Sequence, residues 1–570
     1  RRGSAGYRPD RGSRPGCQPG SGPSSGAVSA GLRIVLIDRG RRIVAAPVDA
    51  AQIAARFAFA ATVVLSPFRA RIELLARPSP PVYGDFTDVL LFWSDAALLL
   101  TLGLWLVSFI GRPQRVRLGP RFLAWSAAGL LAVAWLGVPA SIDPGLSAYQ
   151  AGRLLILALL GLYVLNEIER PADLLLPVGA MVAVQALVGL GQVLAQGSLG
   201  LGALGELRLS PSLPVSVVTA ADGIRTLRAY GLTDHPNILG GLLVLGLLLV
   251  AGAFVAASAD GRRTQGGRVS VRRVQVGGAR VGGARVGGSR VGRARAPWNR
   301  VPWARVRWAR VRWAGLALFG LGAAALLVTF SRSAWLALAV GFVVLAGMLA
   351  PIVGRAARRS VWRPLAAVLL CGAMVSAPFA VAFLPDLLAR TDTQGPIATE
   401  ARSLDERGAV AAATVAVARE HPVLGVGLGT LPLAIQAAQP HFPYDLQPAS
   451  VVLLDAAAET GLLGGLLELA LIVGPWVALV RLRRAWTPEL AVASAALAAV
   501  TVVGFFDYYT WTYQAGRIWA WLVLGLWAAA YAAASAGSVT PAALLHSAAS
   551  TPSTPSTSSA TPRSGIRDAG

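Results

Sequence analysis

The sequence contains no lysine and has little charge of either sign. Only 14% of its 570 residues are Asp, Glu, Lys or Arg, whereas a soluble domain carries roughly 25% charged residues. Cysteine is also scarce: Cys17 and Cys371 lie far apart, which excludes a disulfide framework and a cysteine-based metal site. These shortages together exclude a soluble enzyme, a zinc protein and a secreted mini-domain.

Hydrophobic sequence is abundant instead. It makes up 55% of the chain, and the mean hydropathy is +0.58. Crossing a bilayer takes about 20 apolar residues. Such stretches fall at about 45–66, 87–110, 122–140, 151–167, 174–196, 238–258, 314–330, 334–353, 364–385, 451–480, 488–506 and 515–535. The sequence therefore predicts an all-α, polytopic integral membrane protein with about twelve transmembrane helices.

The arginines predict how these helices are oriented. Short basic loops stay in the cytoplasm, and basic segments precede the first predicted helix and follow the second, sixth, eighth and tenth. All five segments fall on one side if every predicted span is real. We therefore expect both termini to be cytoplasmic (N-in/C-in), with one long outer loop late in the chain.

The predicted spans divide the chain into seven segments. Two groups of helices precede the long outer loop and one group follows it, while both ends and one cytoplasmic loop have compositions typical of disorder. The segments are a disordered cytoplasmic N-terminal segment (1–44), helices one to six (45–258), an Arg/Trp-rich cytoplasmic repeat loop (259–313), helices seven to nine (314–385), the long extracytoplasmic loop (386–450), helices ten to twelve (451–535) and a disordered Ser/Thr/Pro-rich tail (536–570).

The cytoplasmic repeat loop contains a pentapeptide array. Between Val276 and Gly315 the units read VGGAR, VGGAR, VGGSR, VGRAR, APWNR, VPWAR and VRWAR. A period of five fits neither a helix nor a strand. The array is either a membrane-surface arm, with Arg on anionic headgroups and Trp at the interface, or a tolerated repeat expansion. Nucleic-acid binding is not expected, because no recognisable module is present.

Several arginines fall at predicted outer helix ends. Arginine binds phosphate oxygens bidentately and is disfavoured on the translocated side of a membrane. A single one fits snorkelling or an ion pair equally well, but several together would suit a lipid-linked diphosphate. They are Arg153, Arg228, Arg332, Arg402, Arg407 and Arg517.

Four segments give the chain a family resemblance. They are RAYGLTDHPNILGG (228–241), TFSRSAWLALAVG (329–341), EHPVLGVGLGTL (420–431) and AAAETGLLGG (456–465). In this order, within a frame of twelve helices, they resemble the O-antigen ligase and O-antigen polymerase superfamily of bacterial membrane glycan-assembly enzymes. The resemblance runs from roughly Leu99 to Ala530, interrupted by the pentapeptide array.

The resemblance implies an inverting glycosyltransferase that uses no metal, cofactor or nucleotide sugar. Its donor would be a glycan on a polyprenyl diphosphate such as undecaprenyl diphosphate, at the outer face of the bacterial inner membrane. The acceptor would be lipid A core in a ligase or another lipid-linked repeat unit in a polymerase. By the family pattern, Arg228 and Arg332 would hold the diphosphate with Arg407 nearby, and Glu459 matches an acidic residue of the family's E-x-G segment.

The sequence departs from the family pattern at the expected base. Ligases usually carry a His–Asn pair about nine residues before the acidic residue, with the His proposed to activate the acceptor hydroxyl. Here Ser450 and Val451 stand at that place. His441, Asp445 and Asp455 are alternative bases, and His441 fits a solvent-exposed loop residue equally well. The candidate catalytic residues are therefore His441, Asp455 and Glu459.

Two other classes of membrane protein remain as alternatives. A transporter, like relatives described as bicarbonate transporters, should carry ionisable residues at mid-membrane, and the sequence indicates nearly none there. A non-catalytic membrane scaffold would explain the missing histidine. The glycines of GVGLGT, at 425, 427 and 429, are expected to form a turn, because no strand–turn–helix context for a dinucleotide fingerprint surrounds them.

Overall fold

The structure is a computed structural model that describes residues 49–111, 115–219, 223–266, 312–352, 358–391 and 398–549. Residues 1–48 and 550–570, together with 276–311 of the array, lie outside this part of the chain. The predictions of a disordered start and a disordered array therefore concern undescribed residues. Within the described tail, α17 continues to Ala549, and α7 continues to Gly266, past the predicted boundaries at 535 and 258.

The described residues form a bundle of membrane-length helices, which confirms the prediction of an all-α polytopic membrane protein. Ten of these helices are long and apolar enough to cross a membrane. The spans are Trp93–Ile110 in α3 (Trp93–Gly111), Arg121–Ala140 in α4 (Arg121–Gly137) and η1 (Val138–Ala140), α5 (Pro144–Glu167), Pro171–Ala195 in η2 (Pro171–Leu174) and α6 (Leu175–Ala195), Pro236–Val255 in α7 (Pro236–Gly266), α9 (Arg332–Ile352), Val361–Ala382 in α10 (Arg358–Ala382), α14 (Val452–Arg481), α15 (Pro488–Phe506) and Gln514–Ala536 in α17 (Gln514–Ala549).

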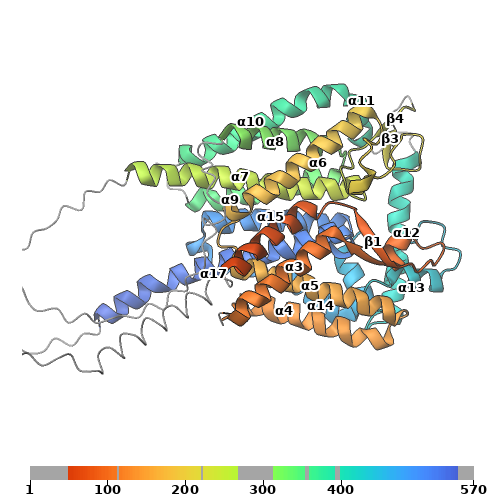
Figure 1. The fold of residues 1–570 in the computed structure, drawn as a ribbon, viewed down its shortest axis with the longest axis horizontal. Coiled ribbons are helices and arrows are strands. Elements are labelled where there is room, and N and C mark those ends of the chain that lie inside the picture. The colour runs from red at the N-terminus through yellow and green to blue at the C-terminus, as the bar shows by residue number, and fades with distance from the viewer. Residues whose placement is uncertain are drawn as a thin grey trace, which may run out of the picture.

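The other two predicted spans also coincide with helical segments. Residues 49–65 are helical, and α8 (Arg312–Leu327) contains the shorter apolar helix Trp313–Leu327. Every predicted span thus overlaps a helix, and successive helices run back and forth through the bundle (Figure 1).

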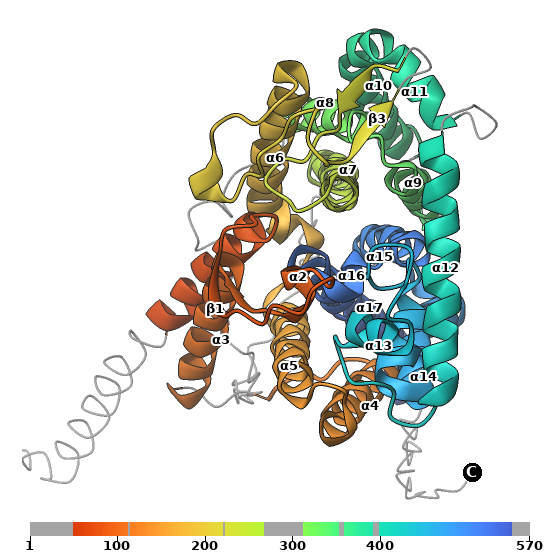
Figure 2. The same ribbon diagram turned by 90° about the vertical axis from the view of Figure 1, so that its right-hand side faces the viewer.

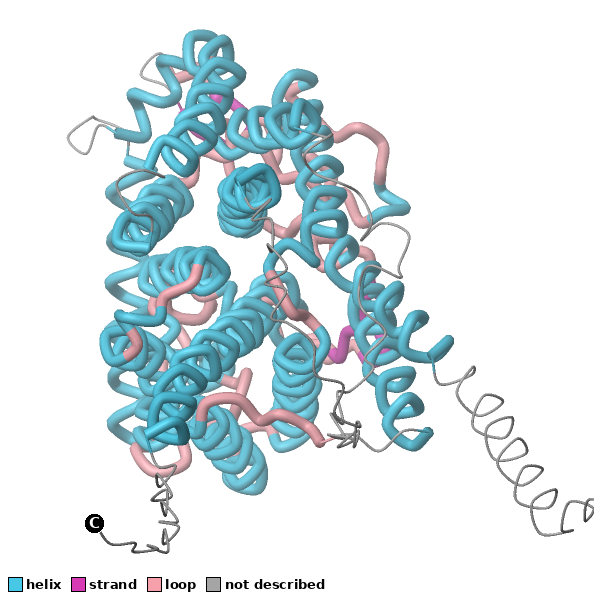
Figure 3. Tube along the Cα trace, turned by 90° about the vertical axis from the view of Figure 1, so that its left-hand side faces the viewer, coloured by secondary structure: helices cyan, strands magenta, loops and turns pink. Residues whose placement is uncertain are grey.

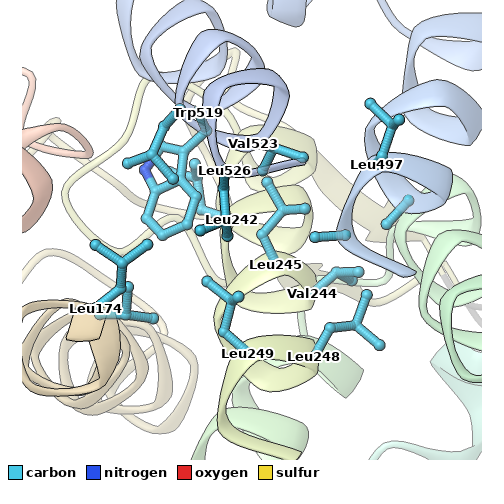
Figure 4. Packing of buried hydrophobic residues seen from close by; sticks show 14 of the residues in the cluster. Leu174, Leu242, Val244, Leu245, Leu248, Leu249, Leu497, Trp519, Val523 and Leu526 are labelled. Carbon is cyan, nitrogen blue, oxygen red and sulfur yellow. The ribbon is translucent and has the colours of Figure 1, made fainter. Parts of the chain in front are cut away.

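The centre of the bundle is α7. Its span has the highest hydropathy of the ten and is almost entirely buried, as expected for a helix that is apolar on all sides. Figure 4 shows Leu242, Leu245 and Leu249 of α7 packed near Leu174, Trp519 and Leu526. Close approach is possible because α7 carries glycines. A Cβ at Gly252 would lie 2.3 Å from a methyl group of Val492 on α15.

The connections at one end of the bundle are folded, and we call this the loop-bearing end. It carries the strand pairs β1 (Arg71–Leu75) with β2 (Val89–Phe92) and β3 (Val217–Thr219) with β4 (Arg225–Leu227), both antiparallel, as Figure 1 shows. Short helices α2 (Gly84–Thr87) and α16 (Tyr509–Thr512) and the turn η3 (Gly202–Leu204) complete this set, while η8 (Arg483–Ala485) follows α14 at the other end. Figure 3 shows that opposite end, where the helices are seen nearly end-on.

The predicted long loop at 386–450 contains three helices. They are α11 (Leu384–Thr391), α12 (Ala398–Glu420) and α13 (Leu431–Ala438). In Figure 2, α12 extends along one side of the bundle from near α11 to α14. Val410, Ala413 and Val417 of α12 belong to a buried cluster of their own. The predicted loop is thus largely helical, and α12 spans the loop-bearing end from near α11 to α14 (Figure 2).

Candidate functional site

Arg228 lies at the loop-bearing end, between β4 and the start of α7. Only 4% of it is exposed. Its Nε donates to the Thr329 carbonyl, its Nη1 to Ser216 Oγ and its Nη2 to Asn237 Oδ1, each at 2.7 Å. These acceptors are neutral and come from three different segments. The guanidinium is therefore fixed in orientation by neutral groups, and the nearby acidic side chain that acts on its charge is Asp507.

Two more arginines meet at the link between α8 and α9. Arg390, in the last turn of α11, donates from Nε to the Phe330 carbonyl at 3.2 Å, and Arg332 at the start of α9 donates from Nη1 to the Arg390 carbonyl at 3.4 Å. Phe330 has a φ of 50°, a left-handed conformation that is rare for a bulky residue. This strained turn holds the carbonyl that Arg390 binds.

The charge of Arg407 on α12 acts on both Arg228 and Arg390. Burial lowers the pKa of Arg228 to about 10, and the charges of Arg407 and Arg332 act in the same direction. Burial likewise lowers the pKa of Arg390 to about 9, and the other three arginines lower it further. We call Arg228, Arg332, Arg390 and Arg407 the arginine cluster. Its members repel one another, so an anion with more than one charge would be attracted to it.

A histidine and an aspartate lie beside the arginine cluster. Burial, together with nearby arginines, lowers the pKa of His235 to about 3, so its imidazole is neutral at neutral pH. His235 Nδ1 accepts the Asn237 backbone N–H at 3.1 Å, which places the proton on Nε2. Asp507 accepts from Asn237 Nδ2 at 2.8 Å. Burial raises the pKa of Asp507, although Asn237, Arg407 and Arg228 oppose that shift.

A separate polar region lies at the start of α14, where Asp455 and Glu459 are both buried. Asp455 Oδ1 accepts the Ala449 N–H at 2.7 Å, while no hydrogen bond to its Oδ2 is found within the described chain. Glu459 Oε2 accepts the Trp511 indole N–H at 2.8 Å. Backbone N–H groups of Gly429 and Leu431 also donate to Glu459. The Glu459 carboxylate is thus surrounded by hydrogen-bond donors.

The GVGLGT segment packs against the segment around Glu459, so two of the motifs found in the sequence are in contact. The glycines of GVGLGT form a turn, as predicted, with φ values of 68°, 103° and 76° at Gly425, Gly427 and Gly429. The helix α14 is broken at Gly461, where φ is 73°. Across this break, the Gly427 N–H donates to the Glu459 carbonyl at 3.0 Å. A Cβ at Gly425 would lie 2.4 Å from that peptide, so only glycine permits this contact.

A small cavity adjoins Glu459. It has an open volume of about 20 Å³ and is lined partly by Glu459, Gln150, Trp511 and Arg517, which is space for about one water. Arg517 Nη1 donates to Gln150 Oε1 at 2.7 Å. The predicted outer-face arginine Arg517 therefore belongs to this cavity and not to the arginine cluster.

The structure brings some predicted site residues together and leaves others apart. Arg228, Arg332 and Arg407 meet in the arginine cluster, as predicted for a shared anion site. Arg153 instead pairs with Asp95 at 3.4 Å. His441 is exposed on the loop after α13, and no hydrogen bond fixes its ring within the described chain. The alternative base Asp445 is exposed too and accepts from Tyr83 Oη at 3.1 Å.

Sequence reasoning missed Arg390, Asp507 and the neutral state of His235. Arg390 follows the ninth predicted span at the same side as Arg228, so the rule that found the other arginines could have found it. Asp507 lies in the short link before the last span, and no local pattern marks it as a site residue. The pKa of His235 depends on burial and has no local sequence signal. Among the described residues, no group of three His, Cys, Asp or Glu that could hold a metal ion is present.

Comparison with known families finds a match to part of the chain. Residues 316–469 match a family model described as O-antigen ligase. The matched segment runs from α8 into α14 and includes Arg332, Arg390, Arg407 and Glu459. The chain is thus a multi-pass membrane protein with a segment similar to the O-antigen ligase family, which confirms the resemblance found in the sequence. No curated protein is similar enough to the chain to count as a match.

Proposed function

We propose that this protein transfers or polymerises a glycan carried on a polyprenyl diphosphate, and that the arginine cluster binds the diphosphate. The observation that carries the proposal is the convergence of four arginines from four separate segments of the chain. A diphosphate has two charged groups with several oxygens, and arginine is the side chain that binds such oxygens bidentately. The neutral His235 can donate a further hydrogen bond from Nε2.

The proposed chemistry is an inverting displacement. The acceptor hydroxyl oxygen forms a bond to the anomeric carbon while the bond from that carbon to the diphosphate oxygen breaks, and the hydroxyl proton passes to a base. Negative charge grows on the diphosphate as it leaves. Guanidinium groups that are already fixed in place stabilise that charge more in the transition state than in the ground state. Of the three candidates from the sequence, His441 is exposed and Glu459 already accepts several hydrogen bonds, so we propose Asp455, whose Oδ2 has no hydrogen bond within the described chain, as the base or its supporting group.

Buried ionisable residues bear on the transporter alternative. The sequence indicated nearly none at mid-membrane, and this was incomplete, because Glu468 lies near the middle of α14 and Arg56 forms a buried ion pair at 3.3 Å with Glu167, the last residue of α5. Gln52 and Trp105 also donate to Glu167, at 3.0 and 3.2 Å. A pair satisfied on several sides serves helix packing and offers no evident path for an ion. The glycan-transfer function therefore remains the one that the site favours.

The proposal is tested by reconstituting the full chain with a polyprenyl-diphosphate-linked oligosaccharide and an acceptor in vesicles. We expect acceptor-dependent release of polyprenyl diphosphate. Lipid A core as the productive acceptor would identify a ligase, and a second copy of the donor would identify a polymerase. Release of polyprenyl diphosphate in the absence of both acceptors would contradict the proposal. No release in the presence of either acceptor would contradict it as well.

The proposed location of the site is the outer leaflet of the bacterial inner membrane. The arginine cluster lies at the loop-bearing end, whereas the described arginines Arg481, Arg483 and Arg484 lie at the opposite end, where α14 ends. Reporter fusions within the array and within α12 should therefore report opposite sides of the membrane, with the array in the cytoplasm. Fusions that report the same side would overturn this location.

A further inference from the structure

A groove opens among the membrane-spanning helices, and no member of the arginine cluster lines it. It lies between α14, α15 and α17 and has an open volume of about 90 Å³. Its lining is mostly apolar and includes Leu471, Leu497 and Leu524. Thr510 and Trp511 line the part of the groove that lies nearest the loop-bearing end. Because its walls are candidate membrane spans, the groove lies at the depth of the lipid hydrocarbon chains.

The groove contains one acidic residue, Glu468, near the middle of α14 (Val452–Arg481). Ionisable side chains are rare and costly at this depth, and those present usually mark a functional site. Thr501, the other polar group deep in the lining, donates to the Leu497 carbonyl at 2.9 Å within its own helix. Within the described chain, no hydrogen bond to the Glu468 side chain is found. Its carboxyl group therefore borders the groove without a protein partner.

Trp511 connects the groove with the polar cavity beside Glu459. This side chain lines both spaces, and its indole N–H donates to Glu459 Oε2. On one side of Trp511 lie the hydrogen-bonding groups of Gln150 and Arg517, and on the other lies an apolar groove. An amphiphile has the same division, with a polar head next to a hydrocarbon chain.

We propose that the groove binds an unbranched acyl chain of the acceptor lipid, whose polar part lies toward the cavity beside Glu459. This inference rests on the proposed function. Two lipid-linked substrates need two separate binding sites, and the arginine cluster is the proposed site for the donor. The groove joins the polar cavity beside Glu459 through Trp511, and no member of the arginine cluster lines either space, so we assign it to the acceptor's acyl chain and not to the polyprenyl chain of the donor. The proposal favours a lipid acceptor, as in a ligase.

A hydrophobic carbodiimide tests this occupancy without measuring activity. The carboxyl oxygen of Glu468 adds to the carbodiimide carbon and the proton passes to its nitrogen, which leaves a mass label on α14. The full chain in vesicles is labelled with and without a diacyl glycolipid or undecaprenyl phosphate. We expect the diacyl glycolipid to slow labelling at least tenfold and undecaprenyl phosphate to have little effect. A Glu468→Gln variant, which should stay unlabelled at this position, confirms the site of reaction.

Matched variants locate the protection. Ala520→Leu and Val500→Phe each add bulk to the groove lining, so more than tenfold more glycolipid should be needed for protection. Leu466→Phe is the control, because Leu466 lies on the same helix as Glu468, is 53% exposed and does not line the groove. Using two filling variants keeps the test valid if one of them fails to fold.

The outcomes separate this inference from the proposed function. Protection by the diacyl glycolipid that persists in Arg228→Lys would support the groove even if the arginine cluster proved not to bind diphosphate. Equal or stronger protection by undecaprenyl phosphate, or no protection by either lipid, would overturn the acyl-chain assignment. Unchanged protection in both filling variants would overturn it as well.

Discussion

The two polar regions at the loop-bearing end of the bundle differ in how their charges are satisfied. In the arginine cluster, Arg228 donates three hydrogen bonds to neutral groups while neighbouring arginines lower its pKa. At the start of α14, the Glu459 carboxylate is instead surrounded by donors from Trp511 and the glycine turn. Like charges held together cost free energy unless a ligand offsets the repulsion. A charge already bonded on several sides is expected mainly to hold the fold together.

This difference gives the two regions different expected roles. The arginine cluster should contribute mostly to binding and rate, and the Glu459 region mostly to stability. Variants in the arginine cluster should therefore change mainly the rate of transfer, and variants in the Glu459 region should change mainly the free energy of unfolding.

The largest expected effect is that of Arg228→Lys and Arg332→Lys on the rate of transfer. Losing one fixed donor to a developing anion typically costs about 3–4 kcal/mol, or roughly a hundred- to thousand-fold in rate. Lysine keeps the charge but cannot reproduce the bidentate geometry. Arg225→Lys is the matched control, since Arg225 is an exposed residue on β4 whose guanidinium donates to the Leu213 carbonyl within the described chain. Wild-type rates in both variants, measured at normal membrane abundance, would remove the diphosphate-clamp mechanism.

A smaller effect is expected from anion binding to the arginine cluster. Inorganic diphosphate should relieve the mutual repulsion, and at 100 times its Kd a ligand stabilises the folded state by about 2.7 kcal/mol. Melting of the purified protein should therefore shift upward with diphosphate. Arg390→Gln should reduce this shift, because it removes a charge that is coupled to all three other arginines. An identical shift in the variant would show that Arg390 does not belong to the anion site.

Part of the arginine cluster could be predicted from the sequence because charge placement in a membrane protein is a strong constraint. Arg228, Arg332 and Arg407 stand out since arginine is disfavoured on the translocated side. The same rule could have found Arg390, but its place in the cluster depends on the fold, because α11 positions its side chain against the Phe330 carbonyl. The ten membrane-length helices of the described chain were predictable from hydropathy alone, since a span needs about 20 apolar residues.

The folded connections could not be predicted in the same way. The hairpin of β1 and β2 precedes α3, and its second strand, Val89–Phe92, is apolar enough to have been merged with the predicted span at 87–110. The glycine turn was predictable from its composition, but its contact with the break at Gly461 joins residues that are far apart in the sequence. Such pairings depend on tertiary packing that local periodicity does not contain.

At the start of α14, Glu459→Gln should mainly lower stability. An amide offers one acceptor oxygen and a donating NH₂ group, so at least one of the donors around residue 459 would lose its acceptor. A buried donor left unsatisfied costs about 1–3 kcal/mol. The expected result is a lower melting temperature with a nearly normal rate per folded molecule. A large loss of rate at unchanged stability would instead support the catalytic role that the family resemblance implies for Glu459.

The smallest effect is expected for His441→Ala. The ring is exposed and no described hydrogen bond orients it, whereas a general base must be held within hydrogen-bond reach of its substrate. The variant should therefore keep a near-normal rate. His235 does not titrate in the working range either, because its pKa of about 3 keeps it neutral above that pH. The rate should thus show no histidine step between pH 5 and 8, in wild type or variant. A severe loss in His441→Ala, together with disappearance of such a step, would identify His441 as the base and show that the loop after α13 closes over the acceptor.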